Sequence, residues 1–389
     1  MWKLIKKHPI TRWFTSLKLT VVCLLLLTIL TVWGTVYQAE HGLYAAQQKF
    51  FHSWFTLVLG FIPFPGAILI MFVLFFNLLF SLLFRIRLRL KNIGNSLIHI
   101  GMMILLIGGF LTFYHAEESY INLVEGQNTR FSRANGQWEL AIWRNQPGSR
   151  RVFAVDTDRL SAGDTISIAD LDISFTVLNY LKNCDARVSA APDKTLFSSA
   201  GIVSLTPKPA EIEPGQNRPG LVADVTRSDH TSAKIILYGG NDRPTPVPDA
   251  GGQLLILLRE KRFLLPFKIE LIDFTMETYP GSNMAKSYQS EVQIDTGVLS
   301  RQVTISMNKP LRYKGYTLYQ SSYFIAPTGR ESSVLTVVKN VWRLFPYIAS
   351  GVIFLGMTLH FLLMLLRKRF SGPPPPKKGI EPVDGEVKK

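Results

Sequence analysis

The stretch NSLIHIGMMILLIGGFLTFYH, residues 95–115, decides the fold class of this chain. A helix needs roughly 20 mainly apolar residues to cross the hydrocarbon core of a bilayer. Apolar stretches of comparable length lie at about 17–37, 55–84 and 344–366. The sequence therefore predicts an integral membrane protein with four transmembrane α-helices, three of them within residues 17–115.

The first apolar stretch has basic residues ahead of it, as a secretory signal peptide does. Its apolar run is too long for a signal peptide, and the segment from Trp33 to Tyr37 lacks the small residues of a cleavage site. We therefore interpret residues 17–37 as a retained span. Pro63 and Pro65 should kink the second span or delay its start, because proline breaks a helix interior.

Lysine and arginine near the span ends indicate the orientation, because cytoplasmic loops carry the excess of positive charge. Basic clusters lie in residues 1–16, in 85–91 and just after the fourth span, whereas the first inter-span loop holds one lysine. This pattern places residues 1–16 and 367–389 in the cytoplasm and 116–343 on the outer side, in what we take to be a bacterial inner membrane. The basic clusters beside the spans also explain much of the net charge of +15. Membrane lipid is therefore the expected partner of these basic residues, and nucleic acid is not.

Residues 116–343 alternate short apolar segments with turn signals, and no long helical period interrupts them. Segments such as 166–178 and 254–258 are typical of strands, whereas 242–252, rich in proline and glycine, is typical of a loop. The pattern predicts a large, mostly antiparallel β-domain, either a sandwich or an open barrel. The proline-rich tail 367–389 is predicted to be disordered.

The sequence contains no P-loop, no dinucleotide-binding fingerprint, no GxSxG elbow and no HExxH motif. A hydrolase or nucleotide-dependent enzyme is therefore not expected, and no catalytic residue is assigned. The chemistry-bearing residues that stand out are the histidines in and near the spans.

His99 lies about one turn into the third span from its cytoplasmic end, and His360 lies about two turns from the cytoplasmic end of the fourth. Polar side chains at such depth usually face a partner or a cavity. Imidazole is a common ligand of haem iron, and Gly94 and Gly101 would let a flat macrocycle approach His99. Because the two spans run in opposite directions, the two histidines should lie at similar depth and could ligate one haem. Each could equally form a hydrogen bond between packed helices.

His41, His52 and His115 lie near the outer ends of the spans. They could ligate a second metal centre, but an ordinary interfacial role explains each of them as well. The sequence alone does not separate these two interpretations.

Two features of the predicted β-domain also allow alternatives. Cys184 could be a reactive thiol or a buried, inert side chain, and its neighbour Asp185 should raise the thiol pKa. Residues 308–323, NKPLRYKGYTLYQSSY, are dense in aromatic rings and positive charge. This segment could complete the β-fold, or it could present a face to a flat anionic ligand or a partner protein.

Several motifs follow one another in a specific order: Gly34–Gln38, Phe51–Trp54, Ser96–Gly101, Gly108-Gly109, Tyr288–Ser290, Val303–Met307 and Asn308–Tyr323. Together they resemble the ResB family, also called CcsB, of system II cytochrome c biogenesis proteins. The resemblance spans most of the chain, although the region between the third and fourth spans is shorter than in many members.

The resemblance implies that the chain works with a polytopic CcsA/ResC-type partner to carry haem b across the membrane and attach it to apocytochrome c. In that family, haem is thought to be held between one histidine from each protein, and His99 occupies the matching position here. The match of His360 is weaker. The chain would then be a haem-handling subunit of a cytochrome c synthase and not a catalyst by itself.

Two other functions remain open at the level of sequence. A respiratory membrane b-type cytochrome would need two well-placed intramembrane histidines within this chain. An envelope scaffold without haem would use His99 only to pack helices. The sequence lacks a tryptophan-rich segment for handling haem, which fits the subunit that does not complete the haem site itself.

Overall fold

The computed structural model of the chain describes residues 8–58, 60–85, 92–144, 151–189, 196–227, 229, 231–249, 252–282, 285–325 and 329–370. The predicted disordered tail beyond residue 370 and the basic residues 86–91 lie outside this part. The chain divides into two compact units, each described here by itself. One unit comprises residues 1–40, 46–114 and 342–389, and the other comprises 41–45 and 115–341.

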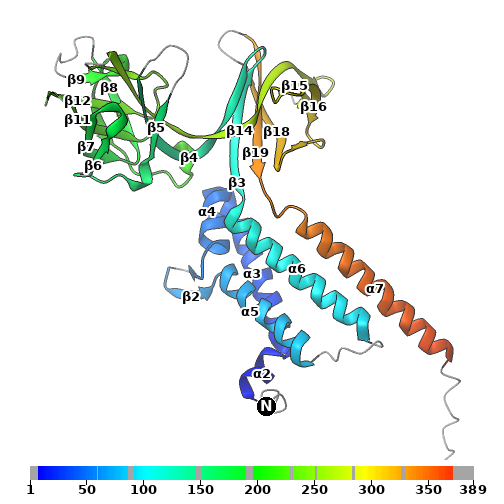
Figure 1. Ribbon diagram of the computed structural model, residues 1–389. Coiled ribbons are helices and arrows are strands. Elements are labelled where there is room, and N and C mark those ends of the chain that lie inside the picture. The colour runs from blue at the N-terminus through cyan, green and yellow to red at the C-terminus, as the bar shows by residue number, and fades with distance from the viewer. Residues whose placement is uncertain are drawn as a thin grey trace, which may run out of the picture. The chain divides into compact units, whose positions relative to one another are not determined.

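Four helices are long and apolar enough to cross a membrane, which confirms the predicted membrane class (Figure 1). They are α3 (Leu17–His41), α5 with its π-helical continuation η2 (Ala67–Phe80 and Ser81–Arg85), α6 (Ile93–His115) and α7 (Phe345–Phe370). The shorter helices near them are α2 (Pro9–Phe14), α4 (Leu43–Ala46) and the π-helical η1 (Gln47–Phe51). In the most apolar 18-residue stretch of each long helix, only 11–28% is buried inside the chain. Most of this apolar surface therefore requires lipid or a protein partner.

The second long helix begins later than the apolar stretch 55–84 predicts. Residues before it form a hairpin of β1 (Phe55–Val58) and β2 (Ile62–Pro65), and α5 begins at Ala67. Pro63 and Pro65 cannot donate the backbone hydrogen bonds of a helix interior, so the helix starts beyond them. Gly66, in extended conformation, is the N-cap.

A buried asparagine fixes the break between α2 and α3. The Nδ2 atom of Asn77, on α5, donates to the carbonyl oxygens of Phe14 at 2.6 Å and Ser16 at 3.1 Å. The hydroxyl of Thr20 donates to Asn77 Oδ1 at 2.7 Å. Asn77 therefore satisfies carbonyl groups that the break would otherwise leave unpaired in an apolar setting.

Helices α6 and α7 meet along a row of glycines. Gly94, Gly101 and Gly108 are spaced by seven residues, which places them on one side of α6. A Cβ atom at Gly94 would lie 2.5 Å from the backbone nitrogen of His360, and one at Gly101 would lie 2.5 Å from Ile353 Cγ1. Glycine therefore allows the two helices to approach closely, as small residues do in membrane bundles.

The second unit is a large antiparallel β-rich domain, as the sequence predicts. Its largest sheet has the order β16 (Ser300–Ser306), β15 (Ala285–Asp295), β14 (Gly252–Thr278), β4 (Asn128–Arg144), β3 (Glu117–Val124), β19 (Glu331–Lys339), β18 (Tyr316–Ile325) and β17 (Leu311–Tyr313), with β13 (Thr245–Asp249) on β14 and β5 (Val152–Asp156) on β4. A second sheet has the order β6 (Thr165–Ile168), β7 (Ile173–Leu181), β11 (Gly220–Arg227), β12 (Ser232–Tyr238) and β9 (Leu196–Ser198), of which only the β12–β9 pair is parallel. A separate pair joins β8 (Cys184–Val188) to β10 (Ile202–Pro207). The 3-10 turns are η4 (Thr157–Arg159), η5 (Ala169–Leu171), η6 (Ser199–Gly201) and η7 (Pro214–Gln216).

Two predicted segments differ in detail from the structure. Residues 166–178 form two strands, because the turn η5 interrupts them and Asp172 adopts a left-handed φ of 56°. Residues 242–252, predicted as a loop, contain β13, which pairs with β14. Its two prolines are tolerated because no further strand is paired on the other side of β13, so their missing N–H groups interrupt no ladder.

The β-domain has two hydrophobic cores, and the long strand β14 contributes residues to both. The first includes Phe175 and Leu221 of the five-stranded sheet and β14 residues up to Leu258. The second includes β14 residues from Leu265 onward, packed against β15, β18 and β19. The intervening stretch Arg259–Arg262 is charged, so β14 carries polar groups between its two apolar halves.

Candidate functional site

His99 is half-buried on α6 and has a defined ring orientation. Its Nδ1 atom lies 2.9 Å from the carbonyl oxygen of Asn95, one turn earlier in the same helix. Because a carbonyl oxygen can only accept, this contact places the proton on Nδ1 and leaves a lone pair on Nε2. A backbone partner of this kind orients many metal-ligating histidines. In a neutral His99, Nε2 therefore keeps a lone pair that could ligate a metal, and haem ligation by this residue stays a prediction.

His99 does not point toward the glycine face of α6. Each residue turns an α-helix by about 100°, so His99, five residues beyond Gly94, lies about 140° around the helix. Phe110 lies eleven residues beyond His99, on nearly the same side, and is 61% exposed. The expected use of Gly94 and Gly101 to admit a macrocycle is not what the structure shows, because α7 occupies their space. His99 therefore lies on a side of α6 other than the one that packs against α7.

His360 is exposed on α7, and its ring lies against Phe361 with centroids 5.7 Å apart. Its backbone packs on Gly94, so it is level with a residue five positions before His99. At a rise of about 1.5 Å per residue, the two positions differ by about 7.5 Å along α6. The structure therefore places the histidines on neighbouring helices but offset in depth and on different sides of α6. Their joint ligation of one haem stays a prediction.

The other three histidines near the spans are exposed. His52 Nδ1 lies 3.1 Å from Gln48 Nε2, and its ring packs edge-on against Phe113 at 4.7 Å between centroids. His41 and His115 end α3 and α6 and also have interactions of their own. Within the described ranges, no group of three histidine, cysteine or acidic residues is arranged to hold a metal ion. A second metal centre at these residues gains no support from the geometry.

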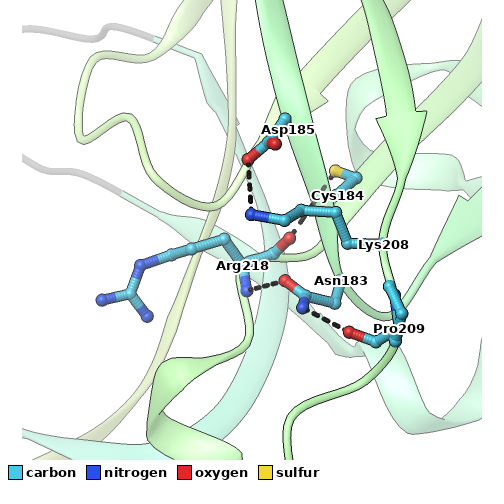
Figure 2. A network of polar contacts seen from close by, with 6 residues as sticks. All are labelled: Asn183, Cys184, Asp185, Lys208, Pro209 and Arg218. Carbon is cyan, nitrogen blue, oxygen red and sulfur yellow. Dashed lines mark hydrogen bonds and ion pairs between the residues drawn. The ribbon is translucent and has the colours of Figure 1, made fainter.

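Cys184 is buried in the β-domain, with only 1% of its surface exposed (Figure 2). Burial, together with the charge of Asp185, raises the pKa of its thiol to about 11. The neighbouring Asn183 accepts from the backbone N–H of Arg218 at 3.1 Å and donates to the carbonyl of Pro209 at 2.7 Å. These surroundings favour the neutral thiol over the reactive thiolate, as expected of an inert cysteine.

The aromatic segment 308–323 contributes mainly to the second β-core. Tyr313 and Tyr316 pack edge-on against Phe267, with ring centroids 5.6 and 6.0 Å apart. Tyr323 stacks on Phe274 at 5.6 Å. Of the two interpretations of this segment, completion of the β-fold is the one that the contacts support.

One charged group was not predicted from the sequence. Tyr120 on β3, Arg133 on β4 and Arg262 on β14 are successive cross-strand partners, so they lie in one row. Glu260 accepts a hydrogen bond from the Tyr120 hydroxyl and lies 3.9 Å from Arg133. Only the strand register brings these residues together, and no spacing in the sequence reveals it.

Comparison with known proteins gives two matches. Residues 248–361 match the model of the ResB-like family. Protein NrfI of Wolinella succinogenes is 31% identical over 100 residues, which make up 25% of this chain but only 11% of NrfI. The matched region is thus a small part of that relative's length. Residues 248–361 are a ResB-like region, which confirms the resemblance of this chain to the ResB family.

Proposed function

We propose that this chain acts in cytochrome c biogenesis as a membrane-embedded, haem-handling subunit. With a CcsA/ResC-type partner, it would carry haem across a bacterial inner membrane and present it on the outer side for covalent attachment to apocytochrome c. The family match supports the biogenesis role. The single structural observation that carries the haem assignment is the orientation of His99.

The residues around His99 fit an iron porphyrin as cargo. The Nδ1–H group of His99 is held by the Asn95 carbonyl at 2.9 Å, which leaves Nε2 available as an axial ligand. Haem supplies the iron that this lone pair would bind. The chain's own contribution is to hold a neutral imidazole in a fixed tautomer within an apolar span.

A second ligand from the partner fits better than one from this chain. His99 lies about 140° around α6 from Gly94, where the backbone of His360 packs. The side that carries His99 also carries the exposed Phe110. A helix of a partner docked on this side could face His99 across a bound haem, whereas α7 lies on another side. The respiratory b-type cytochrome, which needs both ligands in one chain, is less well supported for the same reason.

The inside-positive distribution of charge supports the proposed orientation, with the β-domain outside and both termini in the cytoplasm. The chain by itself is not proposed to catalyse attachment. Thioether formation joins the haem vinyl groups to the two cysteine thiols of apocytochrome c, and no described residue is assigned to that step. The role of this chain is to bind and orient the haem cargo.

The test is the absorption spectrum of the chain purified with its CcsA-type partner. We expect a haem band in the wild-type complex, its loss or shift in His99→Ala, and failure of cytochrome c maturation in the same variant. His360→Ala is the matched control, because His360 lies in a neighbouring span but on another side of α6. It should retain both the band and maturation.

Rescue with free imidazole separates ligation from folding. If His99→Ala only removes a ligand, added imidazole should restore the band, because it can enter the space left by the ring. A His99→Ala complex that keeps the wild-type band and matures cytochrome c would refute haem ligation by His99 and favour the scaffold. Loss of the band in His360→Ala alone would favour a cytochrome with a ligand on α7.

A further inference from the structure

The row formed by Tyr120, Arg133 and Arg262 contains an unusual cross-strand pair. Arg262 on β14 lies directly opposite Arg133 on β4 in the antiparallel register. Directly opposed residues have Cβ atoms about 4.5–5.5 Å apart, and like charges at this distance destabilise a sheet. The pair therefore costs free energy unless neighbouring groups or a bound ligand offset the two charges.

Most other charges around this row are neutralised by partners. Arg259 Nε lies 2.8 Å from Glu139, and Lys261 Nζ lies 2.9 Å from Asp156. Glu260 is engaged by the Tyr120 hydroxyl and by Arg133.

Among the described residues, Arg262 has no acidic side chain within ion-pair distance, and its guanidinium lies 5.9 Å from the centre of the Phe131 ring. Burial, followed by the charges of Arg259 and Arg133, lowers the pKa of Arg262. Glu139 and Asp242 act on Arg262 only from beyond ion-pair distance, so its guanidinium has no described acidic partner in contact.

Apolar side chains lie beside this charge. Phe131 and Leu264 are cross-strand partners in the next row on the same face, and they are 42% and 67% exposed. Strand β13 pairs with β14 only as far as Ile256, and β15 pairs with it only from Lys268 onward. Between these two pairings, residues 257–267 of β14 have no described strand partner on the side opposite β4.

We propose that Arg133 and Arg262 bind the carboxylate of an amphipathic small molecule whose apolar body rests on Phe131 and Leu264. A carboxylate between the two guanidinium groups would compensate the surplus charge and accept bidentate hydrogen bonds. The apolar pair would receive a flat or branched hydrocarbon body. Haem has this chemistry, with two propionates on an apolar ring, so the choice of a porphyrin as probe rests on the proposed function.

The size of the patch favours a small molecule over a protein segment. Stable protein interfaces bury about 800 Å² per partner. Two rows of paired side chains, with neighbouring strands about 4.8 Å apart, cover a much smaller area. A single carboxylate and its adjoining hydrocarbon match it.

The test uses the full-length chain in lipid nanodiscs and metal-free protoporphyrin IX, with empty nanodiscs as background. Metal-free porphyrin has carboxylates but no iron, so His99 cannot ligate it. We expect fluorescence titration to show porphyrin binding by the wild-type chain. Arg262→Gln or Arg133→Gln should weaken this binding at least about ten-fold, because each variant loses one charge-assisted hydrogen-bonded pair. Arg312→Gln, which removes an exposed arginine from β17, should bind as the wild type does. The affinity of Arg262→Lys for the porphyrin should lie between those of the wild type and Arg262→Gln, because lysine keeps the positive charge but lacks the planar guanidinium group.

Protoporphyrin dimethyl ester and an acidic peptide complete the experiment. The ester should not bind above background, because it has no carboxylate. Equal binding of the ester, or equal binding by the glutamine variants, overturns the proposal. Displacement of the porphyrin by the acidic peptide at equal concentration also overturns it, because the site would then accept a protein side chain.

A His99→Ala chain must still bind metal-free porphyrin if the site is real, even where its haem band is lost. The two proposals therefore fail in different measurements.

Discussion

Replacing Gly94 by alanine should force α6 and α7 apart at their closest approach. The added Cβ would lie 2.5 Å from His360 N, 2.6 Å from Gly356 O and 2.7 Å from His360 Cα. Favourable contacts between carbon atoms begin at about 3.5 Å, so the helices must separate locally by about 1 Å. All three atoms belong to the backbone and cannot rotate away. Overpacking of this kind costs about 1–3 kcal/mol.

Gly109→Ala is the matched control, because it makes the same substitution in the same helix. A Cβ at Gly109 would meet no atom within 4 Å. Alanine is favoured over glycine in a helix interior by up to about 1 kcal/mol, so this variant should be neutral or more stable. The same propensity gain applies at Gly94, so the free energies of unfolding of the two variants should differ by the overpacking cost, about 1–3 kcal/mol.

The assay is unfolding of the full chain in mixed micelles with increasing denaturing detergent. Circular dichroism at the helical minimum reports mainly on the membrane helices, because the other unit is β-rich. Gly94→Ala should unfold at lower detergent fraction than the wild type, and Gly109→Ala should not. Coincident transitions for the two alanine variants would show that the glycine contact with α7 does not hold the helices together.

Four further predictions concern single residues in both units. Cys184, with a thiol pKa of about 11, should be about 0.1% thiolate at pH 8. In a Cys23→Ser background, its iodoacetamide labelling should be slow, should rise about ten-fold per pH unit below pH 11, and should become fast on denaturation. Asn77→Leu removes the bonds at the α2–α3 break and should lower the unfolding free energy by about 1–2 kcal/mol in the same detergent titration. Gln320→Ala breaks a buried network in which Gln320 Oε1 lies 2.5 Å from a serine hydroxyl, and should cost about 1–3 kcal/mol by thermal unfolding of the β-domain signal. Arg262→Gln should instead raise stability by about 0.2–1 kcal/mol, because it removes the like-charge pair, and a lower melting temperature would contradict that account.

The membrane helices could be predicted because length and apolarity are local properties. Any run of about 20 apolar residues must be satisfied by lipid or by protein, whatever the rest of the chain does. The start of α5 illustrates the limit of this argument. The apolar run begins at residue 55, but apolarity does not distinguish a helix from the hairpin that precedes Ala67. The two prolines, Pro63 and Pro65, are the residues that indicate the later start of the helix.

The β-domain could be predicted as a class but not as a topology. The sequence predicts residues 254–258 as a short strand. In the structure, they lie in β14, which runs from Gly252 to Thr278 through two cores. Alternation reveals which residues of a strand are buried, and it cannot show that one strand contributes to two hydrophobic cores in succession.

The histidine site shows the same division between local and long-range information. The depth of His99 and its hydrogen bond to Asn95 follow from its position on one helix. The side of α6 on which α7 packs depends on a contact between segments about 260 residues apart, as Gly94 and His360 show. Only that contact assigns the glycines to helix packing and places His99 on a side of α6 that does not pack against α7.

The two proposed sites would recognise different parts of one ligand. An imidazole binds iron through a lone pair and makes no favourable contact with carboxylates, whereas the proposed site at Arg133 and Arg262 would bind carboxylates and make no contact with iron. A protein that delivers its cargo must also release it, so several partial contacts serve it better than one site that saturates every group of the ligand. A single histidine with its second ligand on another protein, and an arginine pair whose like charges oppose each other when empty, both leave binding incomplete within this chain. Under the proposed function, incomplete binding would suit a handling subunit, because the partner that takes the haem would supply the remaining free energy of binding.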